Sequence, residues 1–343
     1  MPKIELKNVY KIFGEDPQSV LQLVQNGATK EEILEDTDHT VGLDNVSISI
    51  EEGETFVCMG LSGSGKSTLI RHIYRLIDPT EGEVLVDGVN VLEFNESELL
   101  ELRRHEMSMV FQSFGLFPHK TVMQNVAYGL EIQDKPLEER NSTAEEQIKA
   151  VGLNGFEHQY PSQLSGGMQQ RVGLARALAT NPGILLMDEA FSALDPLIRN
   201  DMQDQLVELQ SKLHKTIVFI THDLDESLKL GDHIGILNGG RLVQVGKPEE
   251  IIMNPADDYV AAFVKDVNRA KVLRAKTIML STEHNPLNGK KSGDTHKVHE
   301  NSFIEEFLPQ VLEQRSVVEV VDEGGKTIGF ITEKELAQSL SKN

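Results

Sequence analysis

The chain has no tryptophan and a single cysteine, Cys58, in its 343 residues. One cysteine cannot build a disulfide framework, so we expect the protein to work in a reducing compartment. Long apolar runs are also missing, since no window approaches the roughly 20 apolar residues that a bilayer-spanning helix needs. The first residues, MPKIELKNVYKIFG, lack the apolar run of a secretion signal. We therefore expect a soluble chain that reaches a membrane only through a partner.

Basic residues are few compared with acidic ones. The chain has 33 lysines and arginines against 54 aspartates and glutamates, which gives a formal charge of −21. Non-specific binding of nucleic acid requires Lys and Arg to neutralise phosphates, so no nucleic-acid partner is expected. The length leaves room for one large domain and a smaller appendage.

The glycine-rich stretch at residues 60–68 is the strongest motif in the chain. It reads GLSGSGKST and fits G-x-x-x-x-G-K-[ST], the loop that wraps a nucleotide's phosphates. The glycines let backbone N–H groups approach the phosphates, Lys66 supplies positive charge, and the Ser67 hydroxyl can bind Mg²⁺. A strand expected over 55–59 and a helix over 69–76 favour this interpretation over a glycine turn that binds nothing. The expected ATP-binding residues are Gly60, Leu61, Ser62, Gly63, Ser64, Gly65, Lys66, Ser67 and Thr68.

Two acids follow a second apolar run. Residues 184–187 are Ile-Leu-Leu-Met, and Asp188 and Glu189 come directly after them. A buried strand delivers such acids to its carboxyl end, where α/β sheets bind ligands. Asp188 suits holding Mg²⁺ through water, and Glu189 suits accepting a proton from the water that attacks the γ-phosphate. Alone this pattern is usually a plain strand end, but downstream of the glycine-rich loop it predicts a hydrolytic site.

Short apolar runs between helical segments predict an α/β fold. We expect strands at 3–10, 46–50, 83–86, 109–112, 184–187 and 217–220, and a hairpin over 232–245. Residues 14–40 are polar, acidic and partly helical, as in an insertion, and residues 96–160 are rich in helix formers. Residues 275–300 have the polar composition of a linker. A helix over 303–312, a hairpin around residues 324–325 and a closing helix with a capping box at Thr332 and Glu335 follow.

A second helix N-terminus that can bind an anion is expected near residue 165. Ser165 and two glycines precede a predicted helix over 169–178. One nucleotide does not need two such ends on one chain unless the second end serves another subunit. The stretch LSGGMQ resembles the LSGGQ signature of the ATP-binding subunits of ABC transporters, with Met168 between the glycines and Gln169. The resemblance implies a head-to-tail homodimer in which Ser165, Gly166, Gly167 and Gln169 contact the nucleotide held by the other subunit.

The same resemblance carries over to further positions. Gln112 is similar to the glutamine that reaches Mg²⁺ and water and senses the permease, and His222 to the switch histidine at the γ-phosphate. Asp195, in Ser-Ala-Leu-Asp at 192–195, corresponds to the D-loop that crosses the dimer seam. Phe13 lies where an aromatic ring stacks on adenine, with Tyr10 as the alternative. The implied catalytic set is Glu189, His222, Gln112 and Lys66, and the implied metal set is Ser67, Gln112 and Asp188.

The resemblance also implies a domain plan. An ABC-type nucleotide-binding domain is expected over 1–268, with an inserted helical subdomain over about 96–165. A linker over 269–300 and a small α+β module over 301–343 that resembles one CBS module are expected to follow. The tail of this family usually holds a tandem pair of CBS modules, and the second module is absent or degenerate here. A docking tail that binds no ligand is the alternative.

The cargo is indicated only by resemblance. Four stretches together look like the ATP-binding subunits of bacterial quaternary-amine importers: residues 13–17, the insertion up to residue 41, residues 56–68, and DEAFSALDPLIR at 188–199. Such importers take up glycine betaine, proline betaine or choline, often for osmoprotection. The implied partners are an integral-membrane permease and a substrate-binding protein, with this chain peripheral on the cytoplasmic face of the inner membrane. An importer of another small solute is the alternative.

Two rival interpretations are weaker. A non-transport ABC ATPase predicts a long coiled coil, two tandem cassettes or a basic groove, and the sequence has none of these. His296 and His299 lie three residues apart in a polar tract and suggest a metal, but a solvated linker explains them without one.

Overall fold

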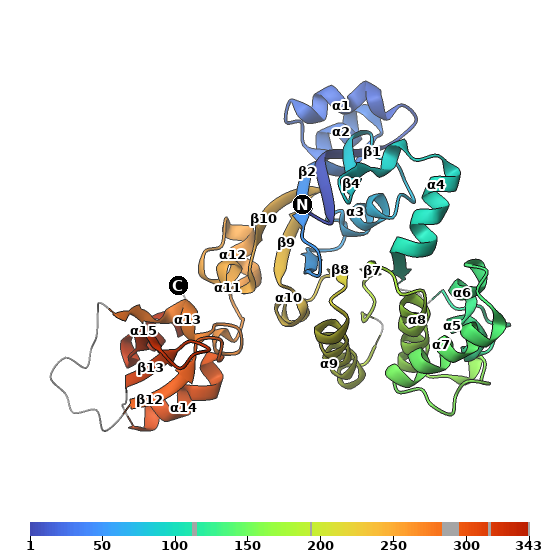
Figure 1. Ribbon diagram of the computed structural model, residues 1–343. Coiled ribbons are helices and arrows are strands. Elements are labelled where there is room, and N and C mark those ends of the chain that lie inside the picture. Colours follow the sequence, from blue (N-terminus) through green and yellow to red (C-terminus); the bar gives the residue numbers. More distant parts are fainter. Residues whose placement is uncertain (112–114, 193, 283–294, 315–316, 342–343) are drawn as a thin grey trace. The chain divides into compact units, whose positions relative to one another are not determined.

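A computed structural model describes residues 1–111, 115–192, 194–282, 295–314 and 317–341 (Figure 1). The chain divides into two compact units, Met1–Val245 and Gly246–Asn343. In the described part of the chain, no helix is both long and apolar enough to cross a bilayer.

Unit 1 contains an antiparallel sheet at its N-terminal end. Its strands are β1 (Ile4–Phe13), β2 (Thr40–Ile50), β4 (Glu81–Val86) and β5 (Val89–Asn90), in the order β2-β1-β4-β5. The expected helical insertion is confirmed, because α1 (Pro17–Gln25) and α2 (Lys30–Thr37) connect β1 to β2. Their apolar faces form a cluster of their own with side chains of β1 and β2, which includes Ile12, Val20, Val24, Ile33 and Val41.

A second sheet forms the centre of unit 1. It contains β10 (Arg241–Gly246), β9 (His233–Asn238), β3 (Thr55–Met59), β8 (Thr216–Thr221), β7 (Ile184–Asp188) and β6 (Met107–Val110), in that order. The strands from β9 to β6 are parallel, and β3, β7 and β8 are buried along their whole length. This burial explains their continuous apolar sequences. Side chains of both sheets share one apolar core. The helix α3 (Lys66–Ile73) packs Leu69, Ile70 and Ile73 into this core.

The helical block follows the strand β6. It comprises α5 (Val122–Val126), α6 (Tyr128–Ile132), α7 (Leu137–Ala150) and a 3-10 turn (Pro161–Gln163), and α8 (Gly166–Ala179) packs against the three α-helices. The expected range of 96–165 started too early. The helix α4 (Glu96–Glu101) and a π turn (Leu102–Glu106) lead into β6, and β6 pairs with β7. The strand expected over 109–112 ends at Val110 in the structure.

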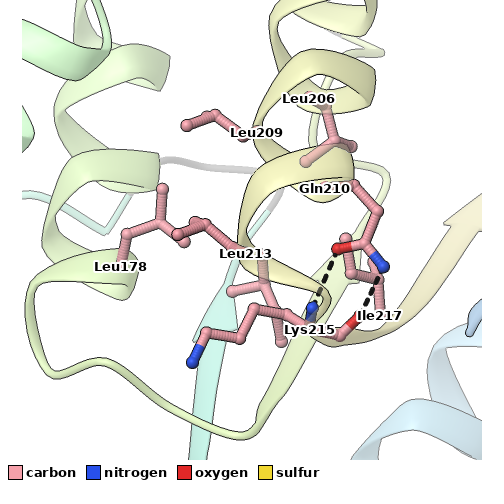
Figure 2. Close-up of a pocket in the computed structure, with 8 residues that line it drawn as sticks. Leu178, Leu206, Leu209, Gln210, Leu213, Lys215 and Ile217 are labelled. Carbon is pink, nitrogen blue, oxygen red and sulfur yellow. Dashed lines mark hydrogen bonds between the residues drawn. The ribbon is translucent and has the colours of Figure 1, made fainter. Parts of the chain in front are cut away.

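Two more helices complete unit 1. The helix α9 (Pro196–Leu213) leads into β8, and α10 (Leu224–Leu230) leads from β8 to β9. Figure 2 shows a small pocket between α8, α9 and β8, with Leu178, Leu206, Leu209, Leu213 and Ile217 in its wall. Its polar members Gln210 and Lys215 bond to each other, since Gln210 Nε2 donates to the Lys215 carbonyl (2.6 Å) and Lys215 N donates to Gln210 Oε1 (3.1 Å). An apolar wall of this kind does not suit a phosphate ligand.

Unit 2 is a small α+β module. The helices α11 (Pro248–Met253), α12 (Asp258–Val264) and α13 (Ala275–Ile278) precede a sheet of order β11-β14-β13-β12. Its strands are β11 (Leu280–Ser281), β12 (Thr295–His299), β13 (Val317–Val321) and β14 (Thr327–Ile331). The helix α14 (Ile304–Gln314), the hairpin β13–β14 and the closing helix α15 (Glu333–Leu340) confirm three expected elements. The capping box at Thr332 and Glu335 is also confirmed.

Part of the expected linker is folded. Leu273, Ala275 and Ile278 are buried in the core of unit 2, and β11 and β12 pair with other strands of its sheet. Within the described part of this polar stretch, it is apolar residues that pack into the core. His296 and His299 lie on β12, and the His299 ring accepts a hydrogen bond from Asn301 N (3.2 Å). Among the described residues, no group of three His, Cys, Asp or Glu side chains could hold a metal ion.

Candidate functional site

Five of the predicted site residues, Lys66, Ser67, Asp188, Glu189 and His222, gather at the carboxyl edge of the central sheet. The strand β8 lies between β3 and β7, with Met59 paired to Thr221 and Asp188 paired to Ile220. The glycine-rich loop follows β3, His222 follows β8, and Glu189 follows β7. Parallel strands deliver their carboxyl ends to one edge, so these three segments, far apart in the sequence, come together there.

The glycine-rich loop is held close to the backbone of neighbouring segments. Gly60 has φ 154°, and a Cβ there would lie 2.3 Å from the Leu237 carbonyl oxygen, so only glycine fits. Gly240 N donates to the Ser64 carbonyl (2.9 Å), which ties the β9–β10 turn to the loop. Leu61, Ser62 and Gly63 are exposed and form the crest of the loop. The backbone of the loop is therefore fixed while its crest faces solvent.

Lys66 lies inside this loop at the first position of α3. Its side chain is 4% exposed, and Nζ donates to the carbonyl oxygens of Gly60 (2.8 Å) and Leu61 (3.0 Å). In the part of the chain that the structure describes, no carboxylate forms an ion pair with this ammonium group. A buried cation without an anionic partner is costly. The arrangement therefore favours an anion at the loop, where the N-terminal end of the α3 dipole also points.

Ser67 and Asp188 meet across the sheet edge. Ser67 Oγ donates to Asp188 Oδ1 (2.9 Å), although the two residues are 121 positions apart. Burial is the main cause that raises the pKa of Asp188, and the hydrogen bond from Ser67 opposes that shift. A hydroxyl beside a carboxylate is an all-oxygen donor set of the kind that Mg²⁺ uses together with phosphate oxygens and water. The residues present thus fit the predicted metal site.

Glu189 has an unusual backbone conformation next to this pair. Its φ is +46°, and its N–H donates to the Ile220 carbonyl (3.0 Å). A non-glycine residue in the left-handed region is strained and persists only where its surroundings hold it. Its carboxylate Oε2 lies 3.5 Å from Nδ1 of His222, whose side chain is 56% exposed. The structure therefore brings together the predicted acid and the predicted histidine at an open face.

The aromatic ring of Phe13 borders the same loop. It is 42% exposed, and its Cε2 would lie 2.7 Å from a Cβ on Gly42. The Thr68 methyl group lies on the same side of Gly42, at 3.3 Å from that Cβ position. Tyr10, in contrast, is only 8% exposed and belongs to the apolar cluster of the insertion. Of the two aromatic candidates, Phe13 is the one whose ring is available to a ligand.

The second predicted anion-binding end is on α8. The helix begins at Gly166 rather than at Gln169, so the two glycines lie in its first turn, and the Ser165 hydroxyl caps it by accepting from Met168 N (3.3 Å). Ser165 and Gly166 are exposed. The amide of Gln169 donates instead to the carbonyls of Pro161 and Leu164, so it holds the loop before the helix. Within the described residues, no hydrogen bond or ion pair joins this end to the glycine-rich loop.

Three further points concern the predicted residues. The carboxylate of Asp195 caps α9 by accepting from Ile198 N (3.1 Å). Gln112 lies outside the described residues, as does Ala193 next to Asp195. The sequence analysis assigns no role to Arg199, whose guanidinium contacts the residues that follow Glu189 and the residue that follows His222. It is the last residue of the stretch 188–199, whose sequence resembles that of quaternary-amine importer subunits.

Comparisons with known proteins agree with this geometry. The family model described as ABC transporter matches residues 43–192. A glycine betaine/carnitine transport ATP-binding protein of Listeria monocytogenes is 58% identical over 283 residues, which are 82% of this chain and 71% of that protein. The ATP-binding protein of the glycine betaine/proline betaine transport system of Escherichia coli is 50% identical over 342 residues, 99% of this chain and 83% of that protein.

A solved structure shows the same fold with a nucleotide bound. It is a dimeric ATP-binding cassette in a post-hydrolysis state with ADP and Pi, with a TM-score of 0.61 and 35% identity over 71% of this chain and 98% of that one. The glycine-rich loop with its buried lysine, the acid pair and the capped α8 end thus occur together in a chain with close ATP-binding relatives. The chain belongs to the ABC transporter family, as an ATP-binding subunit that hydrolyses ATP.

Proposed function

We propose that this chain forms a homodimer on a membrane permease and powers the import of a quaternary amine such as glycine betaine, proline betaine or choline. The observation that carries the proposal is the pair of helix N-termini in unit 1. The α3 end holds Lys66 and adjoins Asp188 and Glu189, whereas the α8 end is capped and exposed and, among the described residues, has no bond to that site. A second copy of the chain would bring its α8 end to the nucleotide.

Phosphate binding is assigned to residues 60–68. Backbone N–H groups of the loop and the start of α3 would point at the β- and γ-phosphates, and Lys66 would exchange its carbonyl contacts for phosphate oxygens. Exchanging neutral acceptors for charged ones strengthens each hydrogen bond. Phe13, exposed beside Gly42 and Thr68, would stack on the adenine ring.

Ser67 and Asp188 would hold Mg²⁺, Ser67 directly and Asp188 through water, with Gln112 as the further predicted ligand. When bound, the ion neutralises charge on the β- and γ-phosphate oxygens. The raised pKa of Asp188 fits this role, because its cause is the burial of a carboxylate that a cation would stabilise.

Hydrolysis is assigned to Glu189 and His222. Glu189 would accept a proton from the attacking water. His222 lies 3.5 Å from that carboxylate and would contact the γ-phosphate. Ser165, Gly166 and Gly167 of the second copy would stabilise the same phosphate with a helix dipole. Because each nucleotide would contact both copies, ATP would close the dimer and hydrolysis would release it.

The partners follow from the same scheme. The permease would contact the surface near Gln112 and residues 114–128, and a substrate-binding protein would deliver the cargo. The chain would then be peripheral on the cytoplasmic face of the membrane. We also propose the domain plan of a nucleotide-binding domain over 1–268, a linker over 269–300 and a single CBS-like module over 301–343; a docking tail without ligand is the alternative to that module. The proposed identity of the cargo is supported by the similarity to the transport proteins of Listeria monocytogenes and Escherichia coli named above.

The test is reconstitution of the chain with the permease and the substrate-binding protein of a quaternary-amine importer. ATP hydrolysis in proteoliposomes should rise when glycine betaine, proline betaine or choline is supplied, and accumulation of the radiolabelled amine should require ATP. The matched control is glycine, which lacks the quaternary nitrogen. Equal stimulation by glycine, or none by any of the three amines, would assign the chain to an importer of another solute.

A further inference from the structure

Arg199 joins two functional segments of unit 1 that are not adjacent in the sequence. It lies on the second turn of α9, and its side chain is 28% exposed. Its Nη1 pairs with Asp223 Oδ2 at 3.5 Å, and its Nη2 donates to the carbonyls of Ser192 (3.3 Å) and Leu194 (3.2 Å). One guanidinium group therefore contacts both the residues that follow Glu189 and the residue that follows His222.

The segment after Glu189 is tied to Glu189 itself. The Glu189 carbonyl accepts from Ser192 N (3.1 Å) and from Ser192 Oγ (2.9 Å). Because the Ser192 carbonyl accepts from Arg199, a displacement of the guanidinium would be passed to the backbone that carries the catalytic acid. Rigid hydrogen-bonded elements of this kind can carry coupling between two sites.

The segment after His222 is ordered in the same way. Asp223 N donates to Thr221 Oγ1 (3.0 Å), and Asp223 Oδ1 caps α10 by accepting from Glu226 N (3.2 Å). His222 stands between these contacts, with its Nδ1 3.5 Å from Glu189 Oε2. The contacts thus form a closed ring that runs from Glu189 through Ser192, Arg199, Asp223 and His222 back to Glu189.

A second contact holds α9 against α10 one turn further along. Gln203 Nε2 donates to Glu226 Oε1 (3.1 Å), and both residues are 4% exposed. Burial is the main cause that raises the pKa of Glu226. Gln203 follows Arg199 by four residues, so the two side chains lie on one face of α9. The helix α9 therefore contacts the His222 side through Asp223 and Glu226 and the Glu189 side through the Ser192 and Leu194 carbonyls.

We propose that Arg199 is a positioning residue that sets the orientation of the 192–195 segment and of His222 together. It would touch neither ATP nor metal. In the proposed dimer the 192–195 segment faces the second copy and His222 faces the γ-phosphate, so this inference rests on the proposed function. Contact of the 192–195 segment with the second copy and contact of His222 with the γ-phosphate would then both act on one ring of contacts, and Arg199 would connect its two sides.

The experiment compares Arg199→Ala and Arg199→Lys in the purified full chain, with Lys212→Ala as the matched control. Lys212 is a cation on the same helix that pairs with Glu208 at the surface. We expect Arg199→Ala to lower kcat about 10-fold or more, since small displacements of catalytic groups are costly. The KM for ATP and the Kd of a fluorescent ATP analogue should stay within about twofold. Lys cannot reproduce the fork of donors, so Arg199→Lys should fall in between.

A double-mutant cycle supplies a readout that a merely structural role would not move. Asp223→Asn keeps a good cap for α10 but loses the charge that Arg199 pairs with. If the two act through one ring, the double variant should lose no more kcat than Arg199→Ala alone. This cycle can be run in the Arg199→Lys background should the alanine variant unfold.

Three results would overturn the inference. They are an unchanged kcat in Arg199→Ala, strictly additive losses in the cycle, or a parallel loss of nucleotide affinity, kcat and melting temperature. Failure of the proposed function looks different, because the unsubstituted chain would then hydrolyse no ATP or would form no ATP-dependent dimer. An unsubstituted chain that dimerises and hydrolyses beside an unaffected Arg199→Ala variant refutes only the role of Arg199.

Discussion

The helices α3 and α8 of unit 1 each present an N-terminus suited to an anion, but they differ in charge. The first turn of α3 begins with Lys66, whose ammonium group is buried inside the glycine-rich loop. The first turn of α8 is Gly-Gly-Met, with only the Ser165 hydroxyl and the helix dipole to offer. A dipole alone contributes about 0.3–1 kcal/mol at an exposed helix end. The α3 end can therefore hold a phosphate by itself, and the α8 end suits one that is already held.

The largest effect is expected from Glu189→Gln. Loss of the general base should lower kcat about 100- to 10,000-fold while ATP still binds. With hydrolysis blocked, ATP should trap a closed dimer in which both helix ends contact one nucleotide. Size-exclusion chromatography with light scattering measures this, and a monomer at saturating ATP would contradict the assignment of the α8 end.

Gly166→Asp tests the uncharged helix end directly. A Cβ at Gly166 meets no atom within 4 Å, and an acid in the first turn of a helix is favourable, so the fold should be unaffected. The new carboxylate would face the nucleotide phosphates of the second copy, and such like-charge contacts cost several kcal/mol.

We therefore expect the Gly166→Asp chain to bind ATP normally and to lose ATP-dependent dimerisation and hydrolysis. Isothermal titration in a monomeric background and the light-scattering assay separate the two outcomes. Retained dimerisation would mean that the α8 end does not meet the second nucleotide.

Lys66→Ala tests the charged helix end. Hydrogen bonds to charged groups contribute about 1.5–3 kcal/mol, so the affinity for ATP should fall about 10- to 100-fold. Lys212→Ala is the control cation and should leave the affinity unchanged. Affinity is measured with a fluorescent ATP analogue. Equal affinities in the two variants would contradict the claim that the charge of Lys66 lets the α3 end hold a phosphate by itself.

The smallest effect on catalysis is expected from His72, in the last turn of α3. Burial lowers the pKa of His72 to about 4, so the folded state binds fewer protons than the unfolded state at mildly acidic pH. The free energy of unfolding should therefore decrease as the pH falls from about 6.5 to about 4. His72→Gln should flatten this dependence, measured by urea denaturation at several pH values. An unchanged pH dependence would show that His72 is not the group responsible.

The features that the sequence predicts well are local. The glycine-rich loop, the buried strands and the capping box at Thr332 each need only a few consecutive residues, and the structure has them. The bond between Ser67 and Asp188 depends on two strands meeting at the sheet edge, so each residue had a predicted role but no predicted contact. Arg199 gave no signal, because an arginine on a polar helix is usually solvated. The linker was misjudged at Leu273 and Ile278, since sparse apolar residues become informative only when their packing is known.

The pairing at the base of the insertion has an evolutionary consequence. Phe13 and Thr40 lie directly opposite each other in β1 and β2, so residues 14–39 leave the sheet and return to it at neighbouring points. Removing them would leave two ends that a short turn can bridge, with the register of β1 against β2 intact. The strand pairing thus permits such a segment to be deleted, but Ile12 and Val41, which it covers, would then need polar replacements.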